Sequence, residues 1–163
     1  MKIRNAEEKD IKAIGDIVNK EITNGTSIFD LEPKSIYEWT SWFELHRSAG
    51  YPVIVAEENG ETAGFASLSR YRAKAAYDTT AELSVYVHEN YRGMGIGSAL
   101  TEQIITIAKQ EKKLHIIISV ITSDNHASIK MHKRLGFEFC GRIPEVGYKF
   151  GRYLSVDSYV LKI

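Results

Sequence analysis

The residues with the clearest chemical potential are three glycines that alternate with other residues in the segment RGMGIG, residues 92–97. The segment lies between a predicted strand and a predicted helix, whose N-terminus offers unpaired N–H groups and the positive end of a dipole. Such a turn typically binds phosphate or pyrophosphate, and the alternative is a flexible turn without a ligand. It is not a P-loop, because the Lys-Ser/Thr pair is missing. It is not a dinucleotide fingerprint either, because Ser98 occupies the third glycine position.

The strand that precedes this segment presents a carboxylate. Residues 80–88 alternate between apolar and polar side chains, which is typical of a strand with one buried face. Glu82 lies on the polar face, together with Ser84, Tyr86 and His88. A carboxylate in this place is a candidate general base, and the alternative is an ordinary exposed strand residue.

Composition limits the class of protein. The 163 residues carry 21 basic and 21 acidic side chains, so nucleic acid is not an expected partner. No apolar run reaches the length of a membrane span, and the charged start does not resemble a signal peptide, so we expect a cytoplasmic protein. No histidine spacing suggests a metal site. The single cysteine, Cys140, is interpreted as a small core residue of a late strand.

The elements that must position these residues alternate along one domain, residues 1–163. Asn5 with Glu8 resembles a capping box before a first helix, and Pro33 fits the first turn of a second helix that ends at Gly50. Asn59-Gly60 predicts a hairpin turn. Strands are predicted at residues 2–4, 51–57, 63–69, 80–88 and 116–122, with two or three more after residue 137. Further helices follow residue 97 and span about 126–135. This pattern indicates an α/β or α+β fold with one central sheet.

Two motifs resemble those of a known superfamily. Residues 92–97 resemble motif A, R/Q-x-x-G-x-G/A, of the GNAT N-acetyltransferases, which use acetyl-CoA. The series NHAS at 125–128, His132 and LGF at 135–137 resembles motif B. Other segments are similar to the phosphinothricin and methionine-sulfoximine N-acetyltransferases: residues 29–33 with Trp39, 76–77, 80–87, 91–93 and 147–152.

The resemblance implies the GNAT fold, a central mixed and mostly antiparallel sheet flanked by about four helices. It also implies acetyl-CoA as co-substrate and no metal. The strand backbone would hold the pantetheine arm, the glycine segment would hold the pyrophosphate, and Asn125 would bind the arm near the thioester, a role compatible with a helix N-cap. The implied cofactor residues are Val85, Tyr86, Val87, Arg92, Gly93, Met94, Gly95, Ile96, Gly97, Ser98, Asn125 and Ser128.

The resemblance also implies catalytic roles. An amine must lose a proton before it attacks a thioester, and Glu82 matches the acidic residue given that role, acting directly or through water. The N–H of Val85 would stabilise the oxyanion. His132 stands where many relatives place a tyrosine that protonates the leaving thiolate, and the alternative is a packing histidine.

The acceptor site is placed by resemblance alone. Arg72 would hold the acceptor's carboxylate, unless it is a solvated loop arginine. The implied substrate residues are Phe29, Arg72, Ala75, Ala76, Tyr77 and Tyr148. The resemblance further implies a homodimer. The aromatic residues Trp39, Trp42 and Phe43 are predicted to be core or interface.

Three functions are therefore in competition. The first is acetyl transfer to the amine of a small amino acid or amino-acid analogue. The second is acetylation of a protein N-terminus or lysine, and the third is acyl-CoA binding without catalysis. The acceptor-loop resemblance favours the first over the second, and Glu82 with His132 favours it over the third.

Overall fold

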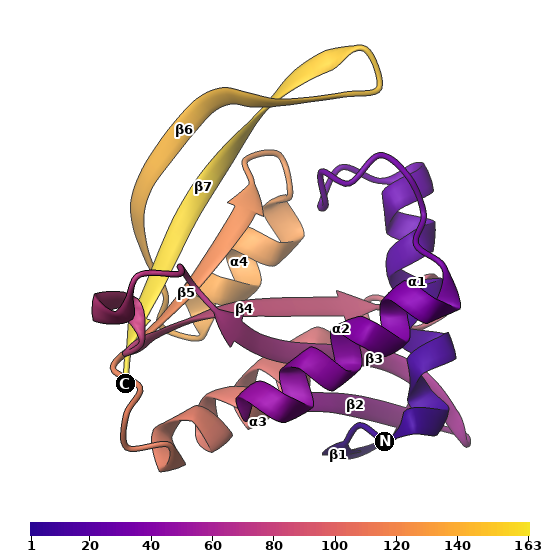
Figure 1. Ribbon diagram of the computed structural model, residues 1–163. Coiled ribbons are helices and arrows are strands. Elements are labelled where there is room, and N and C mark those ends of the chain that lie inside the picture. The colour runs from indigo at the N-terminus through magenta and orange to yellow at the C-terminus, as the bar shows by residue number, and fades with distance from the viewer.

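The computed structural model describes residues 1–163 as a mixed sheet covered by helices on both faces (Figure 1). The seven strands are ordered β1-β2-β3-β4-β5-β7-β6, and every pair is antiparallel except β4 with β5. The strands are β1 (Lys2–Asn5), β2 (Val53–Glu58), β3 (Glu61–Arg70), β4 (Thr80–Val87), β5 (Ile116–Thr122), β6 (Glu138–Lys149) and β7 (Arg152–Lys162). The helices are α1 (Ile11–Asn24), α2 (Ile36–Ala49), α3 (Ile96–Gln110) and α4 (His126–Arg134), with short 3-10 turns at Glu8–Asp10, Ala75–Tyr77 and Glu89–Tyr91. The predicted fold class is confirmed.

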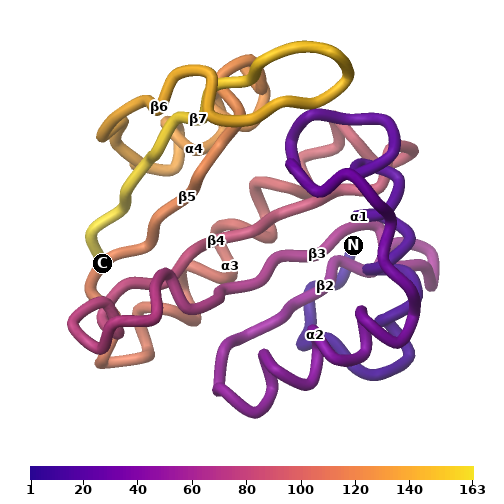
Figure 2. The backbone as a smooth tube through the Cα atoms, turned by 45° about the horizontal axis from the view of Figure 1, so that its top comes forward, coloured from indigo at the N-terminus to yellow at the C-terminus, as the bar shows by residue number.

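The parallel pair β4 and β5 separates after three residues. Their register runs only from Thr80 opposite Ile116 to Glu82 opposite Ile118. Beyond that point β4 stays paired with β3, and β5 stays paired with β7 as far as Thr122. The diverging strands are visible in Figures 1 and 2. We call this opening the fork; its closed end lies at Glu82 and its open end at Val87 and Thr122.

Two apolar clusters cover the two faces of the sheet. The α3 face contains Leu100, Ile104 and Ile117 in its cluster, and Val85 and Val87 of β4 pack against it. The α1 and α2 face is built around residues such as Ile14 and Phe65, with Trp39 and Phe43 buried and Trp42 partly buried. This cluster confirms the prediction for the aromatic residues of α2.

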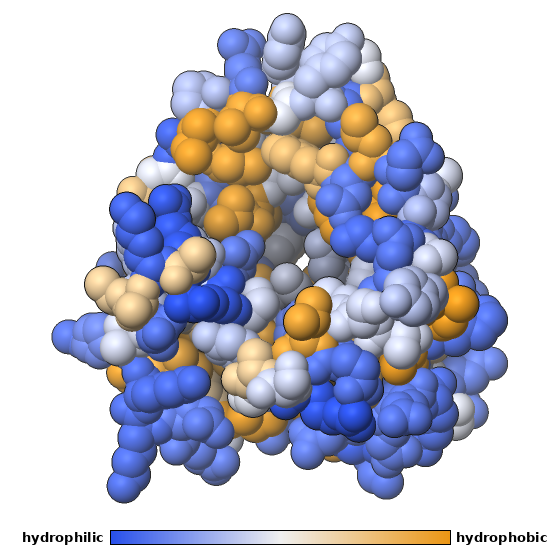
Figure 3. All heavy atoms as spheres, viewed as in Figure 1, coloured by the Kyte–Doolittle hydropathy of each residue, from blue (hydrophilic) through white to orange (hydrophobic).

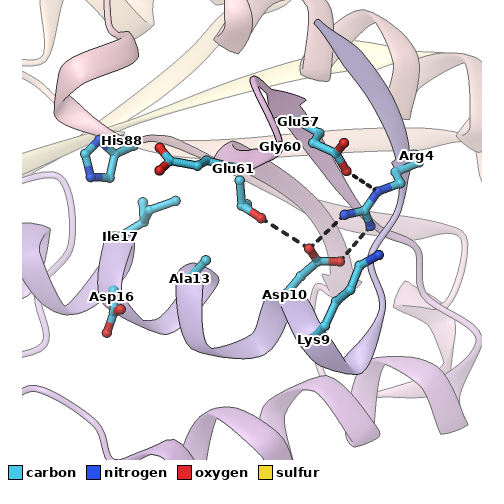
Figure 4. Close-up of a pocket in the computed structure, with 11 residues that line it drawn as sticks. Arg4, Lys9, Asp10, Ala13, Asp16, Ile17, Glu57, Gly60, Glu61 and His88 are labelled. Carbon is cyan, nitrogen blue, oxygen red and sulfur yellow. Dashed lines mark hydrogen bonds and ion pairs between the residues drawn. The ribbon is translucent and has the colours of Figure 1, made fainter.

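The N-terminal caps of both early helices differ from the prediction. The first capping box pairs Glu7 with Asp10, because the Asp10 carboxylate accepts hydrogen bonds from the Glu7 N–H and from two nitrogens of Arg4. Asn5 belongs to β1 instead. A cavity of about 600 Å³ lies beside this ion pair, and no candidate site residue lines it (Figure 4).

The second helix is capped by Ser35 and Glu38, so Pro33 lies before the helix and not in its first turn. The local predictions at glycines are confirmed. Gly50 ends α2 at a φ of 74°. Asn59 and Gly60 form the turn between β2 and β3 with φ values of 52° and 82°.

Cys140 is exposed on β6, so the prediction that it is a core residue is wrong. β6 is the last strand of the sheet, and most of its side chains have no layer above them. None of the four α-helices combines the length and the apolar character that crossing a membrane requires.

Candidate functional site

The backbone of β4 presents free polar groups to the fork. The His88 N–H donates to the Ala63 carbonyl at 2.9 Å, which fixes the positions that hydrogen-bond to β3. Because these positions alternate along an antiparallel pair, Val85 and Val87 turn their N–H and C=O groups away from β3 and toward the fork. Arg92 Nε donates to the Val87 carbonyl at 3.3 Å, which agrees with this orientation.

The glycine segment forms a cradle of backbone donors. None of the six successive N–H groups from Gly93 to Ser98 has an acceptor in the structure, and the next N–H, of Ala99, begins the ladder of α3. Gly93 and Gly95 have φ values of 77° and 81°, and a Cβ at either position would meet nothing within 4 Å. Six unpaired donors on an open loop at a helix N-terminus suit a pyrophosphate.

Helix α4 borders this cradle. Asn125 caps α4 by accepting from the Ser128 N–H at 3.2 Å, as predicted, which leaves its amide NH₂ without a partner in the structure. Arg134 donates to Ser98 Oγ at 2.6 Å. A Cβ on Gly97 would lie 3.4 Å from Met131 Sδ, an ordinary van der Waals contact, so α4 packs directly against the first turn of α3.

Glu82 lies at the closed end of the fork. Its side chain is half-buried and has no hydrogen-bond partner within the chain, and this burial raises its pKa. Tyr86, four residues further along on the same face of the strand, stacks on Phe65 at 5.7 Å between ring centroids. Glu82 therefore points toward the α1 face, whereas Val85 packs toward α3.

His132 is almost completely buried, with 2% of its surface exposed. Its Nδ1 lies 2.8 Å from the Ser128 carbonyl, which requires a proton on Nδ1, and its Nε2 is buried without a partner. Burial lowers the pKa of His132. The imidazole is therefore neutral, and its edge-to-face contact with Phe137, at 4.9 Å, is typical of a packing residue.

Arg72 is exposed in the loop between β3 and β4 and has no carboxylate partner. Its guanidinium lies over the rings of Tyr71 and Tyr77, at 5.0 and 5.7 Å from their centroids. Ala75 and Ala76 are exposed in the same loop. Because Arg70 pairs with Ala81, this loop begins beside Glu82, at the closed end of the fork.

The remaining predicted acceptor residues lie elsewhere. Phe29 packs against Gly147 of β6, where a Cβ would lie 2.3 Å from its ring. Tyr148 is 60% exposed and contacts Tyr153 across the hairpin, at 5.0 Å between centroids. Because side chains alternate along a strand, Tyr148 faces away from the side on which Gly147 contacts Phe29. Phe29 and Tyr148 therefore lie on opposite faces of β6. Phe29 follows Thr26, which is bound to Thr122 at the open end of the fork, whereas the Arg72 loop begins at the closed end.

Sequence reasoning missed two charged residues near Phe29, the partly buried Glu21 and the buried Lys149. Glu21 accepts hydrogen bonds from Ser27 Oγ at 2.6 Å and from Arg92 Nη2 at 3.2 Å. Lys149 is 3% exposed and donates to the Ile28 carbonyl at 3.0 Å. Their partners are distant in sequence. The one sequence signal was a lysine at a strand end that is otherwise apolar and aromatic.

Figure 3 shows that this face of the molecule is hollowed at the fork, where β4 and β5 separate in Figure 1.

Comparison with known proteins identifies this arrangement. Residues 17–137 match the acetyltransferase (GNAT) family model. The chain is 39% identical to the L-methionine sulfoximine/L-methionine sulfone acetyltransferase of Pseudomonas aeruginosa, over 99% of this chain and 94% of that protein. It is 38% identical to the phosphinothricin N-acetyltransferase of Streptomyces coelicolor, over 98% and 94% of the two chains.

Solved structures agree with the sequence relatives. A phosphinothricin acetyltransferase from Sinorhizobium meliloti, in complex with acetyl-CoA, superposes with a TM-score of 0.96 at 31% identity, over 99% of this chain and 88% of that chain. A ribosomal-protein-alanine N-acetyltransferase from Brucella melitensis superposes with a TM-score of 0.97 at 37% identity, over the whole of both chains. The protein therefore belongs to the GNAT family and is an acetyl-CoA-dependent N-acetyltransferase.

Proposed function

We propose that the chain acetylates the α-amine of a small amino acid or amino-acid analogue, of the phosphinothricin and methionine sulfoximine class. The observation that carries this acceptor class is the exposed Arg72 guanidinium, which has no carboxylate partner and belongs to the loop that begins at the Glu82 end of the fork. One group would bind a carboxylate while the other faces the amine, and an α-amino acid carries both groups close together. The sequence relatives named for such acceptors support this assignment.

The cradle and the fork suit acetyl-CoA, which supplies an acyl carbon activated as a thioester. The N–H groups of residues 93–98 would hold its pyrophosphate, and Arg92, Asn125 and Ser128 border or shape that region. The free groups of Val85 and Val87 would bind the pantetheine arm as a strand-like partner, with Tyr86 between them. The side chains of Val85 and Val87 pack on the side of α3, whereas Tyr86 points to the α1 face, as Glu82 does.

Glu82 would act as the base. Burial raises the pKa of its carboxyl, which strengthens it as a proton acceptor once it is ionised. It would take a proton from the acceptor's ammonium, directly or through water, so that the amine nitrogen can attack the acyl carbon. The Val85 N–H would stabilise the oxyanion as the C–N bond forms and the C–S bond breaks.

We infer that His132 packs rather than supplies the proton to the leaving thiolate. Its one proton is engaged by the Ser128 carbonyl, and its free nitrogen is buried. The thiol of coenzyme A has a pKa of about 8.5, so it can leave as a thiolate without an acid, and solvent protonates it afterwards.

The experiment is a screen of the purified protein with acetyl-CoA against methionine sulfoximine, methionine sulfone, phosphinothricin, polyamines and a peptide N-terminus. We expect the amino-acid analogues to react and their decarboxylated forms to react poorly. Equal rates for amines with and without a carboxylate would contradict the proposed acceptor class.

Acetylation of a protein N-terminus is the second candidate, because the similar structure from Brucella melitensis is named for that activity. Preference for a peptide whose first residue is alanine over every free amino acid would establish it. Binding of acetyl-CoA without acetylation of any amine on the panel would instead indicate a sensor.

We also propose that the protein is a homodimer that works in the cytoplasm. The exposed apolar side chains of β6, β7 and their turn support the dimer: Phe139, Ile143, Val146, Tyr148, Phe150 and Tyr153. Light scattering should give twice the mass of one chain. If the acceptors are as proposed, expression of the chain should protect bacteria from phosphinothricin or methionine sulfoximine.

A further inference from the structure

The segment of residues 25–30, which we call the strap, crosses the open end of the fork. It follows α1, and it is fixed to the β5 side by Thr122 Oγ1, which donates to the Thr26 carbonyl at 2.6 Å. It is fixed to the β4 side through Glu21, which binds both Ser27 and Arg92. Figures 1 and 2 both show the segment after α1 beside the β6–β7 turn.

The strap lies on the acceptor side of the sheet. Tyr86 of β4 points to the α1 face, and its pKa is raised by burial and by the nearby carboxylates of Glu21, Asp30 and Glu82. The strap and Glu82 thus share a face, whereas the glycine cradle is formed at the start of α3. On the proposed function, the strap therefore borders the space from which the amine approaches. It does not border the space that would hold the pyrophosphate.

The third attachment of the strap comes from β6. Lys149 Nζ is buried, and its one hydrogen bond is to the Ile28 carbonyl. No carboxylate lies within salt-bridge distance, although Glu21 and Asp30 are close enough to oppose the lowering of its pKa by burial. A buried ammonium is costly unless it is compensated, so its position beside this carbonyl indicates a specific task.

We propose that Lys149 is a positioning residue for the acceptor site. Its ammonium holds the Ile28 carbonyl and thereby keeps Phe29 across the open end of the fork, where the strap borders that site. Phe29 contacts Gly147, which lies on the same face of β6 as Lys149. The lysine and the glycine thus fix neighbouring parts of the strap, one by a hydrogen bond and the other by allowing a close contact. This inference rests on the proposed acceptor function, which it deepens.

The test compares Lys149→Met, which keeps the stem and removes the ammonium, with wild type. Hydrogen exchange of the Ser27 amide of the strap, which donates to Glu21, should accelerate about tenfold or more, while exchange in β5 stays unchanged. With methionine sulfone as the probe, KM should rise about tenfold, with kcat within about threefold and the Kd for CoA within about twofold. Lys149→Arg should raise KM less than Lys149→Met does. Lys162→Met, which changes an exposed lysine of β7, is the control and should leave KM and exchange unchanged.

Gly147→Ala provides an independent variant if Lys149→Met does not fold. Its methyl group would displace the Phe29 ring and leave Lys149 in place, so we expect the same rise in KM at unchanged CoA affinity. Unchanged exchange and unchanged KM in the variant that folds would overturn the inference. If wild type acetylates no amino acid, the proposed function fails, and the exchange measurement still decides whether Lys149 positions the strap.

Discussion

Arg134 of α4 donates a hydrogen bond of 2.6 Å to Ser98 Oγ in the first turn of α3. The bond joins the two helices that border the glycine cradle and brings a guanidinium beside six N–H groups that have no acceptor. If the cradle binds the pyrophosphate as proposed, both helices contribute to that site, although only α3 follows the glycine segment.

Gly95→Asp should abolish acetyl-CoA binding, as measured by calorimetry on folded protein. The carboxylate would enter a cradle built for negative charge, and a non-glycine residue is strained at a φ of 81°. Gly60→Asp is the matched control, because Gly60 has a φ of 82°, equally open surroundings and no place in the site. Undiminished acetyl-CoA affinity in Gly95→Asp would refute the cradle.

Arg72→Ala should weaken acceptor binding by about 1.5–3 kcal/mol and leave acetyl-CoA affinity nearly unchanged, because a charge-assisted contact to a carboxylate is lost. Arg70→Ala is the control, since Arg70 already pairs with Asp78 at 2.9 Å on the surface. Removing the acceptor's carboxylate should weaken binding to the wild type by about as much as Arg72→Ala weakens binding of the intact acceptor. If the losses from the substitution and from decarboxylation add fully, Arg72 does not bind the carboxylate.

Glu82→Gln should lower kcat by about 10²–10⁴ near neutral pH, because the shape is kept and the basicity is removed. Burial raises the pKa of Glu82, so wild-type activity should fall as the pH drops through that raised value and the carboxylate becomes protonated. Higher pH should recover part of the loss in the variant, since the amine then arrives deprotonated. Full activity of Glu82→Gln from pH 6 to 9 would assign the base role elsewhere.

Stability should decrease as the pH falls below about 6.5, the usual pKa of histidine in an unfolded chain. Burial lowers the pKa of His46 and of His132 in the folded state, so the unfolded state binds more protons in this range. Each unit of difference costs about 1.4 kcal/mol. Urea unfolding between pH 7.5 and 5 should show this slope, and His132→Phe should flatten part of it. The same slope in the variant would exclude His132 as a contributor.

The local elements were predictable because their signals are local. The strand at residues 116–122 has the predicted bounds, since a β-branched run meets a polar turn at both ends. Gly50 and Asn59-Gly60 were predictable as a helix end and a turn, because each adopts a positive φ that other residues disfavour. The prediction that Pro33 lies in the first turn of α2 was wrong, because proline is compatible with a helix start but does not require one. The start is set by Ser35 and Glu38, which form the capping box.

The site was only partly predictable. The glycine segment and Glu82 could be recognised, because each belongs to a short pattern on one strand or turn. The contact of Lys149 with Ile28 joins residues 121 positions apart, and the contact of Arg92 with Glu21 joins residues 71 apart. Such pairs depend on where β4 and β5 separate, and no property of either strand alone sets that point.

The unpaired donors of residues 93–98 have a practical consequence for every measurement on this protein. Inorganic phosphate or sulfate in a buffer should occupy the same N–H groups, stabilise the folded chain against heat and compete with the nucleotide. The apparent Kd for acetyl-CoA should therefore rise with phosphate concentration at constant ionic strength. Affinities of the wild type measured in phosphate and in an amine buffer should differ, and phosphate should not stabilise Gly95→Asp against heat.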